Sequence, residues 1–316
     1  MSIGNRVLGT TQYAEEADFR SDLRKFLIGI RRELELISRL MLVNQFAGTW
    51  PGVLFVCTAC QYCKLSGVET IEKIAIGVVV FFFYDFIFDA GNQTERRATE
   101  EDAINKPHRP IPAGLVTRQR LRQRFWIGMA IYTTLGALLG VLPWILLWQA
   151  TVLWLYYSRP RDYIWVKPIA MFSATFCQLV TAWQLVTPID STGWLWIAVL
   201  TTLWTPPLRF EDLRDMEGDR NIGRVTSCLR FGEWPLRIKF AVYMYSMPFA
   251  LYFLLYRTTT HASTWVVLSC SAAMLVITWS AGTLGLLVRN RRMDAIAYQV
   301  YMSGYILSTI TGAILL

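Results

Sequence analysis

The sequence has few of the features that would stabilise a small extracellular or metal-binding domain. Six cysteines occur among its 316 residues, and they form no disulfide framework. Cys57, Cys60 and Cys63 have the spacing of metal ligands, but no second cluster of cysteine or histidine completes a site, so we interpret them as small apolar residues. No linker rich in proline, glycine and serine, and no low-complexity tract, divides the chain. One structural unit is therefore favoured.

Charged residues are almost absent from long stretches of the chain. In the chain as a whole, 54% of the residues are hydrophobic and the mean hydropathy is +0.34. Runs of roughly 20 apolar residues can cross a bilayer core about 30 Å thick. The backbone polar groups of such runs must be paired internally, which requires helices. The sequence predicts an all-α, polytopic membrane protein with nine spans, at residues 37–60, 71–90, 123–142, 143–157, 166–187, 191–209, 236–256, 264–288 and 295–316.

The 31 lysines and arginines are distributed unevenly between the predicted loops. All except Lys64, Lys73 and Arg257 fall on one side of the nine spans. The positive-inside rule places that side and the N-terminus in the cytosol, and an odd number of spans places the C-terminus across the membrane. The net charge of +8 is explained in this way, because no basic domain stands apart from the spans. We predict an integral protein of the endoplasmic reticulum with no nucleic-acid partner and no obligate protein partner.

Two regions follow from this pattern: a cytosolic N-terminal arm, residues 1–36, and a single transmembrane helical domain, residues 37–316. In the arm, Phe19, Leu23, Phe26 and Leu34 recur at helical spacing. This spacing predicts an amphipathic helix that lies on the membrane surface. A solvated helix leading into the first span is the alternative, and the pattern alone leaves both open.

Acidic and basic residues gather in two predicted cytosolic loops, the first at residues 85–109. Asp85 and Asp89 lie one helical turn apart, so they share a face and repel each other unless a cation lies between them. Oxygen ligands of this kind suit Mg²⁺. Lys106 and Arg109 can hold phosphate oxygens, and three prolines stiffen the segment around Arg109. A solvated loop with incidental ion pairs is the alternative interpretation.

The second loop, residues 212–224, carries Asp212, Asp215 and Asp219 at positions i, i+3 and i+7, which is one stripe of a helix. Such a stripe can coordinate divalent ions that in turn clamp a diphosphate. The two acidic clusters are separated by four predicted helices, so two related helical halves would bring them together across a cavity. Two clusters on a membrane bundle imply a diphosphate substrate with an apolar tail, whose carbon–oxygen bond ionises to an allylic carbocation.

Three segments resemble the UbiA-type intramembrane prenyltransferase superfamily: NKPHRPIPAG at 105–114, YSRP at 157–160 followed by Lys167, and DLRDMEGDRNIGRVT at 212–226. The resemblance implies a UbiA-like helical bundle around a central cavity, in which Mg²⁺ supports ionisation of an isoprenyl diphosphate. It implies Asp89, Asp215 and Asp219 as catalytic residues. The implied metal ligands are Asp85, Asp89, Asp212, Asp215 and Asp219. The implied diphosphate-binding residues are Asn92, Gln93, Lys106, Arg109 and Lys167.

The first motif departs from the superfamily pattern. Asp85 stands where asparagine is expected, Gln93 stands where the last aspartate would be, and an insertion precedes Asp102. Either Asp102 or Gln93 could complete the motif. This local pattern resembles the fungal membrane-bound terpene cyclases of the superfamily, so a cyclase acting on farnesyl diphosphate is favoured. The alternative is a prenyltransferase that attaches an isoprenyl chain to an aromatic or quinone precursor. A transporter is disfavoured because the acidic residues cluster at one face.

Overall fold

The computed structural model describes the fold of residues 4–42, 44–157 and 163–316, and the side chains of these ranges except those of residues 4–21 and 163. All regular secondary structure in these ranges is helical, as predicted. The elements are, in order, α1 (Gly4–Met41), α2 (Thr49–Tyr62), α3 (Gly67–Thr94), α4 (Arg96–Asn105), α5 (Arg118–Leu138), α6 (Leu142–Tyr157), α7 (Tyr163–Gln184), α8 (Ser191–Trp204), the 3₁₀-helix η1 (Pro206–Glu211), α9 (Asp212–Asn221), α10 (Ser227–Phe231), α11 (Glu233–Leu251), the π-helical turn η2 (Tyr252–Tyr256), α12 (Arg257–Thr259), α13 (Thr264–Leu287) and α14 (Arg291–Leu315).

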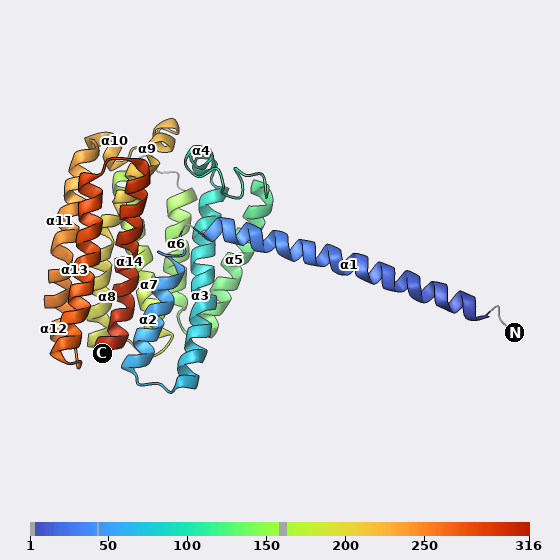
Figure 1. The fold of residues 1–316 in the computed structure, drawn as a ribbon, viewed down its shortest axis with the longest axis horizontal. Coiled ribbons are helices and arrows are strands. Elements are labelled where there is room, and N and C mark those ends of the chain that lie inside the picture. Colours follow the sequence, from blue (N-terminus) through green and yellow to red (C-terminus); the bar gives the residue numbers. More distant parts are fainter. Residues whose placement is uncertain (1–3, 43, 158–162) are drawn as a thin grey trace.

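Long helices run side by side through the bundle, and short helices cover one end of it (Figure 1). Seven of the nine predicted spans each overlap one long helix or, for the seventh, the continuous run of α11, η2 and α12, whereas the first is divided between α1 and α2 and the sixth between α8 and η1. Within the described residues, four helices are long and apolar enough to cross a membrane: Gly67–Thr94, Ile164–Gln184, Glu233–Thr259 and Thr264–Leu287. The chain is therefore an integral membrane protein with several candidate spans, and the count of nine stays a prediction.

The first predicted span is wrong in its N-terminal part, because residues 37–60 do not form one helix. Helix α1 ends at Met41 and α2 begins at Thr49. A continuous helix would need the backbone N–H of Pro51 to bond the carbonyl of Ala47, and proline has no N–H. The side-chain amide of Gln178 donates to the Ala47 carbonyl instead, at 2.9 Å. The turn between α1 and α2 is thereby held against α7.

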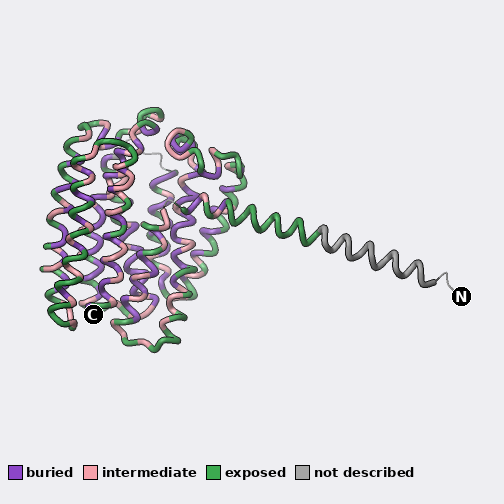
Figure 2. The backbone as a smooth tube through the Cα atoms, viewed as in Figure 1, coloured by how far each residue is buried: buried purple, intermediate pink, exposed green. Residues whose placement is uncertain are grey.

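Helix α1 leaves the bundle and runs roughly across the direction of the other long helices (Figure 1). Figure 2 shows that most of its described part is exposed. Phe26 and Leu34, which the amphipathic pattern included, are 63% and 62% exposed. Glu33 pairs with Arg124 of α5 at 2.5 Å, which fixes the base of the arm. The predicted helix is confirmed, and its position on a membrane surface stays a prediction.

The two acidic loops meet at one end of the bundle, opposite the C-terminus (Figure 1). In the first, α3 continues to Thr94 and the inserted segment forms a separate helix, α4. In the second, η1 leads directly into α9. Helix α4 packs closely on α9, because a Cβ at Gly218 would lie 2.3 Å from the amide nitrogen of Asn105 and 2.8 Å from Cγ of Glu101. A glycine at position 218 therefore sets the distance between the two acidic clusters.

Candidate active site

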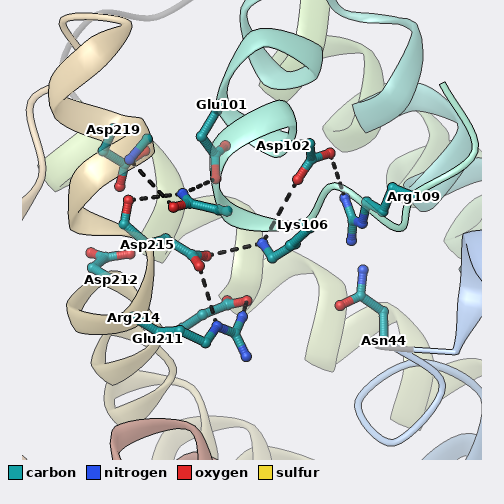
Figure 3. Close-up of polar contacts among 12 residues, drawn as sticks. Asn44, Glu101, Asp102, Lys106, Arg109, Glu211, Asp212, Arg214, Asp215 and Asp219 are labelled. Carbon is teal, nitrogen blue, oxygen red and sulfur yellow. Dashed lines mark hydrogen bonds and ion pairs between the residues drawn. The ribbon is translucent and has the colours of Figure 1, made fainter. Parts of the chain in front are cut away.

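Helix α9 presents its three aspartates on one buried face, as the spacing predicted. Asp212, Asp215 and Asp219 are between 2% and 7% exposed. Two of their basic partners come from elsewhere in the chain: Lys167 of α7 lies 2.6 Å from Asp212, and Lys106, just after α4, lies 3.0 Å from Asp215. Figure 3 shows the three aspartates and Lys106 around one space between α4 and α9. The structure thus brings the predicted diphosphate-binding lysines to the predicted metal ligands.

Burial and neighbouring charges act against each other on α9. Burial raises the pKa of Asp219 to about 7, although Arg224 opposes the change. Burial likewise raises the pKa of Asp212, against the effect of Lys167. At Asp215 the same effect of burial is outweighed by Lys106 and Arg214, which hold the pKa below its ordinary value. The carboxylates of this helix therefore depend on positive charge close by to remain ionised.

Asp89 of α3 faces the same end of the bundle and is completely buried. Its Oδ1 accepts a hydrogen bond of 2.5 Å from the side chain of Asn44 and lies 3.6 Å from Arg109. Its Oδ2 has no hydrogen-bond partner among the described residues. Arg109 is itself only 2% exposed, and its side chain lines the polar pocket described below.

Gln93 and Asp102, the two candidates for completing the first motif, bond to each other. The Gln93 amide nitrogen donates to Asp102 Oδ2, and Arg109 donates to the same oxygen at 3.0 Å. The Gln93 carbonyl oxygen accepts from the backbone N–H of Ile111. Both side chains are completely buried, and neither is among the described residues that line the two cavities at this end of the bundle. Asn92, in contrast, lines the polar pocket described next.

Two adjoining cavities occupy the centre of the bundle at this end. The outer one, the polar pocket, has a volume of about 630 Å³ and is lined mainly by charged and amide side chains from α3, α4, α7 and α9. The inner one, the aromatic chamber, has a volume of about 670 Å³. Asn44, Phe88, Met171 and Glu211 line both.

The aromatic chamber is walled by rings from α3, α6, α8 and α14, namely Tyr84, Phe88, Trp148, Trp204, Tyr298, Tyr301 and Tyr305. Trp183 of α7 is not among the residues that line the chamber, and it packs against Phe55 and Tyr62 at centroid distances of 5.5 and 5.3 Å. Asp85, predicted as a metal ligand, lines the chamber rather than the polar pocket and accepts from Thr49 at 3.1 Å.

Four polar residues of the pocket were not among the predicted site residues: Asn44, Glu101, Glu211 and Arg224. For Asn44 a signal existed, because the Asn44–Gln45 pair interrupts an apolar run, and polar residues within membrane segments usually have a function. For Glu101 the sequence offers three consecutive acidic positions and no means of choosing between them. The YSRP motif extends into residues 158–162, which lie outside the described residues.

The donor set fits a divalent cation that prefers oxygen. In the part of the chain that the structure describes, no three acidic, histidine or cysteine side chains form a closed cation cage. Basic side chains stand between the carboxylates instead: Lys106 Nζ lies 3.0 Å from Asp215 and 4.0 Å from Asp102. Oδ1 of Asp102 and Oδ2 of Asp89 are buried without a hydrogen-bond partner. Mg²⁺ prefers oxygen ligands such as carboxylates. Here several carboxylates lie close together, with basic side chains between them and two oxygen acceptors that have no hydrogen-bond partner.

Known proteins resemble this chain along most of its length. It is 28% identical over 279 residues to a somaliensene A/B synthase from Streptomyces somaliensis, covering 88% of this chain and 91% of that protein. It is 35% identical over 213 residues to the diterpene cyclase eriG from Hericium erinaceus, covering 66% of this chain and 68% of that protein.

A solved structure of a UbiA homolog from Archaeoglobus fulgidus bound to DMAPP and Mg²⁺ has the same fold. Its TM-score is 0.59 at 12% identity, and the match covers 87% of this chain and 99% of that one. The model of the UbiA prenyltransferase family matches residues 52–301, which include α3, α7 and α9 and therefore both acidic clusters. With fold, motifs and pocket in agreement, the chain belongs to the UbiA prenyltransferase family.

Proposed function

We propose that this protein is a Mg²⁺-dependent, membrane-bound terpene cyclase that ionises an isoprenyl diphosphate, with farnesyl diphosphate favoured, and releases diphosphate. The observation that carries the proposal is the pair of adjoining cavities, one lined by acidic and basic side chains, the other aromatic. This division matches a substrate with a diphosphate head and a hydrocarbon tail. The similarity to a somaliensene synthase and a diterpene cyclase supports cyclisation over transfer.

In the polar pocket, the proposed metal ligands are Asp212, Asp215 and Asp219 on one side and Asp89 on the other. When bound there, Mg²⁺ supplies positive charge to the leaving diphosphate. Asp89 is bonded to Asn44 and lies beside Arg109, both of which line the pocket. These two side chains must therefore move before an oxygen of Asp89 can bind a metal ion in the pocket. Lys106, Arg109, Lys167 and Asn92 would donate to the diphosphate oxygens.

In the aromatic chamber, the chain's rings would hold the hydrocarbon tail folded. The carbon–oxygen bond breaks, and its electron pair leaves with the diphosphate. The allylic cation is then attacked by a double bond of the same chain, and loss of a proton restores a neutral terpene. The faces of Trp148, Trp204 and Tyr301 can stabilise positive charge on carbon by cation–π interaction.

The proposed placement has nine transmembrane helices, with the polar pocket facing the cytosol and the protein in the endoplasmic reticulum. It rests on the distribution of basic residues, since Lys64, Lys73 and Arg257 belong to the end of the bundle away from α4 and α9. Accessibility of cysteines introduced into α10 and into the loop between α2 and α3 would test it. Reagents applied from the cytosolic side should label the α10 site alone.

The alternative function is prenyl transfer, which membership of the UbiA prenyltransferase family favours. A product analysis distinguishes it from cyclisation. The purified protein in lipid nanodiscs is incubated with farnesyl or geranylgeranyl diphosphate and Mg²⁺, with no acceptor, and hydrocarbons are identified by mass spectrometry. We expect a cyclic terpene from one of the two substrates and none from the Asp215→Asn variant. Recovery of intact substrate, with turnover restored by an aromatic acceptor, would establish the prenyltransferase instead.

A further inference from the structure

Glu101 occupies a position in the polar pocket that neither candidate of the first motif occupies. It lies on α4, one residue before Asp102, and is 4% exposed. Its side chain lines the pocket and points towards α9, as Figure 3 shows. Asp102, by contrast, turns the other way, where Arg109 and Gln93 bind it. Of the acidic residues described on α4, Glu101 is the one that reaches the pocket.

One nitrogen atom holds Glu101 and Asp219 together. Nη1 of Arg224 lies 2.8 Å from Oε2 of Glu101 and 2.8 Å from Oδ1 of Asp219. A single positive centre therefore bridges carboxylate oxygens from two helices that are distant in the sequence. A divalent cation makes the same kind of bridge with shorter bonds, about 2.0–2.1 Å for Mg²⁺. Arg224 stands in for such a cation in the free protein.

The surroundings of Glu101 hold it in place for this task. The Asn105 side chain donates to Oε1 of Glu101 at 3.0 Å and to the backbone carbonyl of Asp215 at 3.0 Å. The backbone N–H of Gly218 donates to the side-chain oxygen Oδ1 of Asn105 at 3.3 Å. The carboxylate of Glu101 is thus fixed relative to α9 through a neighbour that itself bonds α9, so its alignment with Asp219 survives displacement of Arg224.

We propose that Glu101 completes the metal site of this chain in place of Asp102 or Gln93, and that Arg224 occupies the metal position until a divalent cation displaces it. The inference rests on the proposed function. When displaced, Arg224 gives up its bridge between Glu101 and Asp219 and becomes free to donate to the oxygens of a bound diphosphate. The inserted helix α4 is then the element that supplies the first cluster's ligand.

Binding of Mn²⁺ to the resting protein tests the assignment without measuring turnover. Free Mn²⁺ is quantified by electron paramagnetic resonance during titration of the wild type and of Glu101→Gln, Glu100→Gln and Asp219→Asn. Glu100 is the matched control, because it is the adjacent residue of the same type and pairs with Arg96 at the surface. The glutamine at 101 can still accept from Asn105, which preserves the packing of α4. Thermal unfolding of each variant checks this.

We expect Glu101→Gln and Asp219→Asn each to weaken Mn²⁺ binding by at least about tenfold, and Glu100→Gln to bind as the wild type. Wild-type binding by Glu101→Gln, together with a loss in Asp219→Asn, would overturn the role of Glu101 and leave the proposed function intact. Wild-type binding by all variants would overturn both the metal site and the inference.

The variant Arg224→Gln gives a second test, because its binding of Mn²⁺ and its binding of diphosphate should change in opposite directions. In Arg224→Gln, Mn²⁺ should bind more tightly in the absence of diphosphate, because the competing cation is gone. Inorganic diphosphate should bind the Mn²⁺-loaded variant more weakly than it binds the wild type, because a donor is gone. Weaker Mn²⁺ binding in this variant would show that Arg224 holds the ligands in position rather than competing for them, and would overturn the exchange.

Discussion

Replacing Gly218 with alanine sets two opposing effects against each other. Gly218 is a buried residue inside α9, and in a helix interior alanine is favoured over glycine by about 0.5–1 kcal/mol. The added methyl group, however, would lie 2.3 Å from Nδ2 of Asn105 and 2.8 Å from Cγ of Glu101. Overpacking of this kind costs about 1–3 kcal/mol. Moving the Asn105 side chain aside also endangers its bonds to Asp215 and Gly218, each contributing about 0.5–1.5 kcal/mol.

The steric and hydrogen-bond terms exceed the propensity term, so we expect Gly218→Ala to destabilise the protein by about 1–3 kcal/mol. Because α4 must move away from α9, Glu101 and Asp219 separate, and turnover should fall by at least about tenfold; a misplacement of 1 Å costs about 10²-fold. Thermal unfolding in detergent and release of diphosphate measure the two effects. Gly29→Ala is the control, because Gly29 is an exposed glycine of α1 where an added Cβ would meet no neighbouring atom within 4 Å. This variant should be neutral or slightly stabilising.

A double-mutant cycle shows whether Asn105 is the neighbour that matters. In an Asn105→Ser background the amide nitrogen that the new methyl group meets is absent, so the added cost of Gly218→Ala should shrink. Additive effects would place the strain at Glu101 alone. A Gly218→Ala variant as stable and as active as the wild type would refute the reasoning, because propensity would then have prevailed over the close approach of the two helices.

Further predictions concern the metal, the pH and the bundle. Asp215→Asn should lower turnover by at least about 10²-fold, equivalent to about 3 kcal/mol of barrier, and EDTA should abolish activity until Mg²⁺ is returned; turnover that survives either treatment contradicts the metal's role. Because the pKa of Asp219 is raised to about 7, a proton competes with the metal for this carboxylate near neutral pH. The apparent Mg²⁺ affinity should therefore fall as the pH drops through 7. An Mg²⁺ affinity that does not change between pH 6 and 8 would be inconsistent with this. Asp294→Asn removes the buried charge partner of Arg237, bonded at 2.6 and 2.7 Å, and leaves it only Glu233 at 3.3 Å, so the protein should be destabilised by about 3–5 kcal/mol; an unchanged unfolding temperature would argue against that cost.

The all-helical bundle could be predicted well because bilayer thickness restricts the length of apolar runs, and runs of about that length recur along the chain. The stripe of Asp212, Asp215 and Asp219 was equally accessible, since helical spacing alone places them on one face and α9 is a helix. The meeting of both acidic clusters at one end followed from the distribution of basic residues. Each of these features depends on local periodicity or on a one-dimensional charge pattern.

The choice among Glu100, Glu101 and Asp102 depends on something else. Successive residues of a helix point in directions about 100° apart, so one of three consecutive acids faces the pocket in almost any rotation of α4. The rotation is determined by the contact of Asn105 and Glu101 with Gly218, more than a hundred residues later in the chain. The sequence holds no local trace of that contact, and the motif comparison left Asp102 and Gln93 as the two candidates.

The break between α1 and α2 was missed for a related reason. Pro51 is a local signal that a helix cannot continue unaltered, yet proline is tolerated in the first turn of a helix, and a kinked span looks the same in the sequence. A tertiary contact decided the outcome. A Cβ at Gly48 would lie 2.4 Å from Oδ1 of Asp85, so the turn must pass directly over α3 at this point.

That turn gives the protruding arm a mechanical connection to the reaction space. Helix α1 ends at Met41, and Asn44, which bonds Asp89 and lines both cavities, follows three residues later. A force that lifts or tilts α1 is therefore delivered by the backbone to the boundary between the polar pocket and the aromatic chamber.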